Sequence, residues 1–327
     1  MGKVKMRKRY IAGIAVTVFA IAGLSISTAY AANEVDLSKP CSLTLDVGDR
    51  NASTFAEDLA TTELHANLYK VADVDKYGRY TSLEAYESLE LEKAVSGEGD
   101  WSEKAVEAAV LVEEIDPDAE IVMIDGEGIA EELEAGMYLV VVEDGVTACY
   151  EYTFSPYLIC LPDNPYYQTN DPADNHYEYD ITASLKAEQA PRYGDLEIQK
   201  TLTSYNTSLK DVTFVFQVEG VDANGATVYS NVVSTTHSAA GTKKVVIEGI
   251  PAGTDITVTE VYSGASYKVS GAQKANTVIA AEDIVSVKFT NIYDDELVPG
   301  YGVTNHFELD ENNGWKWSQL KDNSVVE

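Results

Sequence analysis

The stretch Asp195-Leu-Glu-Ile-Gln-Lys-Thr-Leu202 decides the fold predicted for the C-terminal half of the chain. Its apolar and polar residues alternate, which is typical of a β-strand whose successive side chains point to opposite faces. In this pattern Lys200 shares a face with the apolar residues Leu196 and Ile198. An ammonium group on a buried face is costly unless it is paired or neutral, so the pattern requires a partner for Lys200.

Two later segments also carry one polar residue on an otherwise apolar face. Ile256–Tyr262 and Val285–Ile292 both alternate as strands do, and their apolar faces include Glu260 and Asn291 respectively. The first, a middle and the last strand of one domain would then each direct one polar side chain into the core. The alternative is that Lys200 reaches solvent at a strand end, Glu260 forms an ordinary salt bridge and Asn291 caps a turn.

The three residue types fit a reaction that forms an amide. Burial lowers the pKa of a lysine towards the neutral, nucleophilic amine and raises the pKa of a glutamic acid so that it holds a proton. Glu260 can then hydrogen-bond the side-chain carbonyl of Asn291 and pass a proton to departing ammonia. We expect an isopeptide bond between Lys200 and Asn291 if the first and last strands are neighbours. This chemistry occurs once per molecule, so we expect no turnover enzyme.

The composition indicates an acidic globular protein. Its 327 residues suffice for two or three domains. It carries 54 acidic against 23 basic side chains, which would repel phosphate backbones, so we expect no nucleic-acid partner. The histidines lack the spacing of metal ligands and no nucleotide-binding motif occurs, so we expect no metal and no small-molecule cofactor.

Residues 1–31 have the features of a cleaved export signal. Basic residues open the chain, Tyr10–Ile26 is an apolar stretch short for a membrane span, and Ala29-Tyr-Ala31 is a small-x-small cleavage site. We therefore expect an extracellular protein, secreted or at the cell surface. The C-terminal end at Val325-Val-Glu327 has the pattern of neither a sorting signal nor a membrane anchor, so we expect attachment by other means or secretion.

An exported chain can form disulfides, and this one has three cysteines. Cys149 and Cys160 lie on either side of Phe154-Ser-Pro156, so they can form a disulfide across a hairpin and leave Cys41 over. Three reduced thiols are the alternative, because a disulfide requires a close approach of the two Cα atoms.

Residues 32–187 indicate an N-terminal, β-rich domain of mixed structure. Trp101–Ile115 has the spacing of apolar residues that predicts a helix. Met137–Val142 predicts a β-branched strand, with Val146–Phe154 as its hairpin partner. Ile129–Leu133 is expected to add one helical turn.

Residues 188–194, which contain Pro191 and Gly194, indicate a short linker. Residues 195–293 are rich in Val, Thr and Ile and lack a helical pattern. Turn signals separate their short alternating runs, which predicts an immunoglobulin-like β-sandwich and makes the chain mainly β. Residues 294–327 form an acidic C-terminal tail whose pattern indicates no particular fold.

Four motifs stand out in this domain: Leu196-Glu-Ile-Gln-Lys-Thr201, Thr257-Val-Thr-Glu-Val261, Phe289-Thr-Asn-Ile-Tyr293 and the turn Gly249-Ile-Pro-Ala-Gly253. Together they resemble the collagen-adhesin B-type (CnaB-like) module of Gram-positive surface proteins and pilins. The preceding domain, with Glu134-Ala-Gly-Met-Tyr-Leu-Val-Val-Val142, looks like the N-terminal module of pilin-like subunits.

The resemblance implies an exported structural protein of the cell surface, a pilin-like subunit or an adhesin. It also implies that Lys200 and Asn291 are joined by an isopeptide bond, with Glu260 as its catalyst. The partners would be other surface or pilus subunits, or a host or matrix protein or glycan. The alternative is a secreted carbohydrate- or protein-binding module without this bond, with the Tyr-rich loop Asn164–Tyr179 as its contact face.

Overall fold

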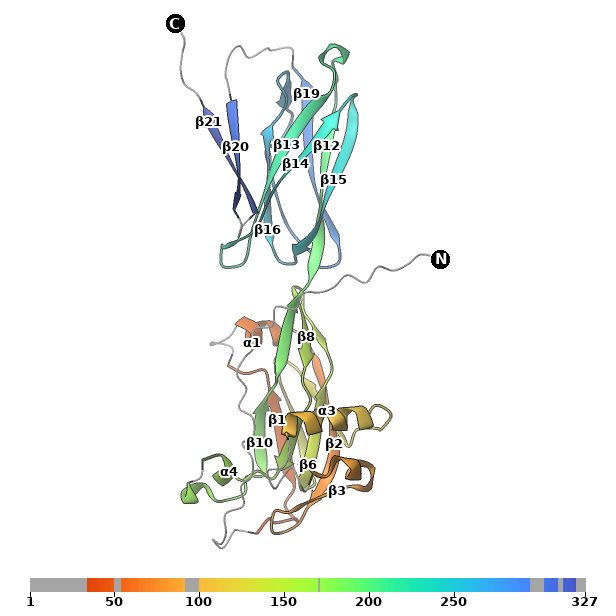
Figure 1. Cartoon of the computed structure of the whole chain (residues 1–327), viewed down its shortest axis with the longest axis vertical. Coiled ribbons are helices and arrows are strands. Elements are labelled where there is room, and N and C mark those ends of the chain that lie inside the picture. Colours follow the sequence, from red (N-terminus) through yellow and green to blue (C-terminus); the bar gives the residue numbers. More distant parts are fainter. Residues whose placement is uncertain are drawn as a thin grey trace. The chain divides into compact units, whose positions relative to one another are not determined.

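The computed structural model describes residues 34–49, 54–91, 100–169, 171–294, 303–310 and 314–321. The expected export signal, residues 1–31, lies outside these ranges. No helix within them is long and apolar enough to cross a membrane. The chain forms two compact units (Figure 1). Unit 1 comprises the chain up to Thr147 together with Glu151–Ala190, and unit 2 comprises Ala148–Tyr150 together with the chain from Pro191 onwards.

Unit 1 is a mixed, β-rich domain, as predicted. Its largest sheet has the order β3-β2-β6-β9, with β4 also paired to β2, and two three-stranded sheets have the orders β10-β1-β5 and β11-β8-β7. The helix α3 packs on the large sheet through the buried Ala105 and Ala108. Its elements are β1 (Cys41–Asp46), α1 (Thr54–Leu59), β2 (Leu64–Val74), β3 (Tyr80–Ser82), η1 (Glu84–Leu89), α3 (Trp101–Leu111), β4 (Ala119–Met123), β5 (Glu127–Leu133), β6 (Gly136–Val142), β7 (Gly145–Val146), β8 (Tyr150–Phe154), β9 (Tyr157–Leu161), α4 (Tyr166–Thr169), η2 (Pro172–Asp174), β10 (Asp180–Ser184) and β11 (Ala187–Pro191).

Two local predictions for unit 1 were wrong. The strand β6 pairs with β2 and β9 and not with the segment 146–154, which contains the end of β7 and all of β8 and belongs to a separate sheet. Residues 129–133 belong to strand β5 instead of a helical turn, because β5 pairs with β1 and buries Ala130 and Leu133. In both cases long-range pairing, which local sequence does not report, overrides the local preference.

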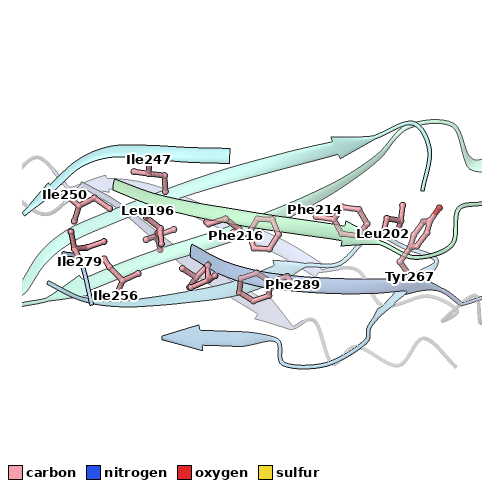
Figure 2. Close-up of a cluster of buried hydrophobic side chains, with 14 of the residues drawn as sticks. Leu196, Leu202, Phe214, Phe216, Ile247, Ile250, Ile256, Tyr267, Ile279 and Phe289 are labelled. Carbon is pink, nitrogen blue, oxygen red and sulfur yellow. The ribbon is translucent and has the colours of Figure 1, made fainter. Parts of the chain in front are cut away.

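Unit 2 is a β-sandwich of two four-stranded sheets, with the orders β15-β12-β19-β17 and β14-β13-β16-β18. Apolar side chains from both sheets form one core, and Figure 2 shows them gathered between the strands. The elements are β12 (Tyr193–Leu202), η3 (Thr207–Leu209), β13 (Val212–Val221), β14 (Thr227–His237), β15 (Gly241–Pro251), β16 (Asp255–Tyr262), β17 (Tyr267–Val269), β18 (Lys274–Val278), β19 (Ile284–Tyr293), β20 (Val303–Asp310) and β21 (Gly314–Lys321).

The first and last strands of the sandwich are hydrogen-bonded neighbours. β12 pairs in parallel with β19, and Leu202 lies opposite Asn291 in this register. On its other side β12 pairs antiparallel with β15, so β12 is an inner strand with a core-facing row of side chains. The segment expected as a linker, 188–194, carries the end of β11 and the start of β12, and the C-terminal tail contains the hairpin β20–β21.

Candidate functional site

Lys200 lies in the core of unit 2, where the alternation of β12 directs it. Its side chain is 0% exposed, as are those of Glu260 and Asn291. The Nζ atom lies 4.3 Å from the ring centroid of Phe214 and 5.8 Å from that of Phe216. Cation–π contact offsets part of the lost hydration, but an ammonium in an apolar core still requires a counter-charge.

Glu260 supplies this counter-charge from the opposite sheet. It lies on β16, and its atoms Oε1 and Oε2 accept hydrogen bonds from Lys200 Nζ at 2.9 Å and 2.8 Å. On the neighbouring strand it lies opposite Phe216, whose ring also contacts the ammonium. The ion pair therefore joins the two sheets through the middle of the sandwich.

Asn291 completes the cluster from β19. Its Nδ2 donates to Glu260 Oε1 at 2.6 Å and more weakly to the Ser263 carbonyl at 3.4 Å. β12 and β19 pair in parallel, and both Lys200 and Asn291 point into the core. Lys200 lies opposite Phe289, and Asn291 lies opposite Leu202, the next inward-facing residue of β12. The carboxylate of Glu260 thus contacts both other side chains at once.

The orientation of the Asn291 amide differs from the one expected. The expected contact was between the carboxyl of Glu260 and the carbonyl oxygen of Asn291, whereas Nδ2 of Asn291 is the group in contact. The Oδ1 atom is buried and has no hydrogen-bond partner among the described residues. An ionised carboxylate only accepts hydrogen bonds, so it selects the amide nitrogen; a protonated Glu260 would select the oxygen.

Burial moves the two ionisable groups towards the neutral pair. Desolvation lowers the pKa of Lys200 to about 8, against the opposing effect of Glu260. Desolvation raises the pKa of Glu260, opposed by its hydrogen bonds to Lys200 and Asn291. Each shift disfavours the charged form, so transfer of a proton from Nζ to the carboxylate requires less free energy than it would in water.

Sequence reasoning did not identify His237 as part of this region. It is 1% exposed at the end of β14, and its ring lies edge-on to Phe214 with centroids 5.5 Å apart. Its Nε2 atom is buried without a hydrogen-bond partner among the described residues. The sequence offers one signal, the spacing of two residues between Thr235 and His237, which places them on the same face of a strand. The structure buries both.

We expect His237 to make unit 2 less stable in acid. Burial, followed by the positive charges of Lys243 and Lys200, lowers the pKa of His237. As the pH falls below about 6.5, the unfolded chain binds a proton that the folded chain resists, so the free energy of unfolding decreases. In thermal unfolding of the full chain between pH 7 and pH 5, His237→Leu should reduce this decrease, whereas substitution of the exposed His65 by Gln should not. Equal pH dependence in wild type and His237→Leu would contradict the argument.

The expected disulfide between Cys149 and Cys160 is not formed. All three cysteines are described, and none is in a disulfide. The hairpin that would bring the pair together is absent, because β8 pairs with β7 and β11 whereas β9 pairs with β6. Cys149 belongs to unit 2 and Cys160 to unit 1.

In the Tyr-rich loop 164–179, none of the tyrosines whose side chains the structure describes is fully exposed to solvent. Tyr179 is 7% exposed and its hydroxyl accepts a hydrogen bond from the Asp36 amide at 2.7 Å. Tyr166 and Tyr177 are half-buried. These residues therefore serve the packing of unit 1, and the loop offers no specific support for the alternative of a binding module.

Comparison with known proteins gives one family match and several similar structures. Residues 196–294 match the family model described as a domain of unknown function, DUF5979. A comparison with curated proteins finds no match. Similar solved structures include the minor pilin GBS52 of Streptococcus agalactiae, which is 14% identical with a TM-score of 0.25 and for which the alignment covers 81% of this chain and 100% of the pilin.

Two further similar structures are pilins. The major pilin SpaD of Corynebacterium diphtheriae is 10% identical with a TM-score of 0.28, and the alignment covers 80% of this chain and 100% of SpaD. The shaft pilin SpaA of Lactobacillus rhamnosus GG is 13% identical with a TM-score of 0.27, and the alignment covers 78% of this chain and 98% of SpaA. The DUF5979 match spans the segment that contains Lys200, Glu260 and Asn291.

Proposed function

We propose that the chain is an exported structural protein of the cell surface, a pilin-like subunit or adhesin, stabilised by an isopeptide bond between Lys200 and Asn291. One observation carries the proposal: a fully buried carboxylate contacts both the amine and the amide that would be joined. A structural role alone would not require an Asn beside an already paired Lys and Glu.

The reaction begins with proton transfer inside the ion pair. Nζ donates to both carboxylate oxygens, so one proton can pass from Lys200 to Glu260 without solvent. The products are a neutral amine and a carboxylic acid, the forms that burial favours. The protonated Glu260 selects the carbonyl oxygen of Asn291 instead of its nitrogen. It can then donate to this oxygen and polarise the carbonyl towards attack at Cγ.

The amide forms when the Nζ lone pair attacks Cγ of Asn291. A bond between Nζ and Cγ is made, and the Cγ–Nδ2 bond breaks. Glu260 takes a proton from the attacking nitrogen and delivers one to the departing Nδ2, which leaves as ammonia. Glu260 keeps the proton that it first received from Lys200, so it ends as a neutral carboxylic acid. The product replaces a buried charge and a buried primary amide by one neutral amide.

The proposed bond would suit a protein that bears tension outside the cell. It would connect the first and last strands of unit 2 covalently, so a force on the two ends of the sandwich would act on the bond instead of on the hydrogen bonds between β12 and β19. The proposed partners are other surface or pilus subunits, or a host or matrix protein or glycan. A single bond-forming event per molecule makes the chain a structural protein rather than a turnover enzyme.

The intact mass of the folded protein tests this proposal. We expect a mass about 17 Da below that calculated from the sequence and its observed N-terminus, because one ammonia is lost. Lys200→Ala and Glu260→Ala should both have the full calculated mass. Lys243→Ala is the matched control, since this exposed lysine lies opposite Lys200 on β15 and its loss should leave the 17 Da deficit. A wild-type protein of full calculated mass would exclude the bond.

A further inference from the structure

A short segment after β12 is hydrogen-bonded to the last residues of β19. The amide and hydroxyl of Thr203 both donate to the backbone carbonyl of Asn291, at 3.0 Å and 3.2 Å. The amide of Tyr293 donates to Ser204 Oγ at 2.8 Å. Asn206 Nδ2 donates to the Tyr293 hydroxyl, also at 2.8 Å. The segment 203–206 therefore fixes the position of Asn291, the residue that would react, and of Tyr293.

Aromatic rings extend from this segment to the amine. The rings of Tyr293 and Tyr267 meet edge-on with centroids 5.6 Å apart, and those of Tyr267 and Phe214 do so at 5.9 Å. Phe214 in turn lies under Lys200 Nζ. Figure 2 shows Tyr267 and Phe214 at the same end of the core as Leu202. The backbone amide of Asn206 also faces the Tyr267 hydroxyl, at 3.4 Å.

We propose that Asn206 and Tyr293 form a latch that positions Asn291 for attack by Lys200 and closes this end of the core over the reacting groups. The inference rests on the proposed function, and it assigns the latch residues no part in proton transfer. They are positioning residues, because Asn206 binds the Tyr293 hydroxyl, Tyr293 packs on Tyr267, and both act through the backbone of β19 and through the aromatic rings.

Two properties of the latch make it suitable for this role. Effective attack requires the reacting atoms to be held about 3–3.5 Å apart, and a displacement of about 1 Å can reduce a rate about 100-fold. The latch acts two residues from the carbon under attack, on the same strand. It also joins a segment next to the first strand with the end of the last strand, so it forms only when the sandwich is complete. Bond formation would then follow folding of unit 2 and not compete with it.

The test compares two hydroxyl removals in the full chain. Tyr293→Phe deletes the acceptor of Asn206 and keeps the ring. Tyr205→Phe is the control, because this half-buried tyrosine lies in the same segment but its hydroxyl bonds to the Lys210 carbonyl and not to β19. Protein made by cell-free translation is quenched in denaturant at intervals, and the fraction with the 17 Da deficit is measured. We expect Tyr293→Phe to form the bond at least about tenfold more slowly and Tyr205→Phe within about twofold of wild type.

A second pair of variants separates positioning from folding. Asn206→Ala removes the latch, whereas Asn206→Asp keeps it, because the Tyr293 hydroxyl can donate to a carboxylate. We expect slow bond formation with Ala and recovery with Asp, at a temperature where circular dichroism shows every variant folded. Tyr293→Phe reacting as fast as Tyr205→Phe, while wild type forms the bond, would overturn the latch alone. Absence of the bond in wild type would overturn the proposed function and the latch with it.

Discussion

Glu260→Ala should abolish the proposed isopeptide bond and leave Lys200 as an unpaired buried amine, which destabilises unit 2 by about 3–5 kcal/mol beyond the loss of the link. The variant leaves Lys200 fully buried without its counter-charge, beside Phe214 and Phe216. The amine must then lose its proton, which costs free energy at neutral pH, or reach water, which disrupts packing in the core. Chemical denaturation of the full chain, followed together with intact mass, measures both consequences.

A double variant separates the loss of charge pairing from the loss of volume. Lys200→Met combined with Glu260→Leu also prevents the bond, but it fills the site with apolar side chains of similar size. Replacing a buried ion pair in this way is often neutral or stabilising by about 1–4 kcal/mol. We therefore expect the double variant to resist denaturant better than Glu260→Ala although it carries one more substitution. A double variant less stable than the single one would contradict this account.

Burial of these three side chains could be predicted from sequence because a strand has a period of two. Lys200, Glu260 and Asn291 each follow the parity of apolar neighbours, and all three are 0% exposed. The same rule predicted the sandwich. The local sequence pattern does not show which strands pair. The expected isopeptide bond therefore depended on the adjacency of β12 and β19, which only the sheet order shows.

The features that escaped prediction depend on contacts between distant segments. The orientation of the Asn291 amide follows from the ionisation of Glu260, which lies on the other sheet. The polar residues of β14 obscure its alternation, so the sequence does not show that His237 is buried. The structure shows it, because the ring of His237 packs on Phe214. In unit 1, the strand β5 has little local β signal and is stabilised by pairing with β1.

Asn291→Ala should reveal how much stability the proposed covalent link supplies. The bond would close a loop of about 90 residues, and the chain-entropy model for cross-links of this length gives about 4–5 kcal/mol. For a domain of about 100 residues, a change of 1 kcal/mol moves the melting temperature by about 4–8 °C, so loss of the link should lower the melting temperature of unit 2 by roughly 16–40 °C. Differential scanning calorimetry of the full chain measures this shift.

The substitution also removes the contact between residue 291 and Glu260 and leaves a small cavity, and these effects must be subtracted. The Lys200→Ala background serves this purpose, because it cannot form the bond but keeps the contact between Asn291 and Glu260. In this background Asn291→Ala should be destabilising by only about 1–3 kcal/mol, the effect of a lost buried hydrogen bond. The difference between the two backgrounds is then the contribution of the link. If Asn291→Ala lowers stability equally in both, the strands β12 and β19 are held by packing and hydrogen bonds alone.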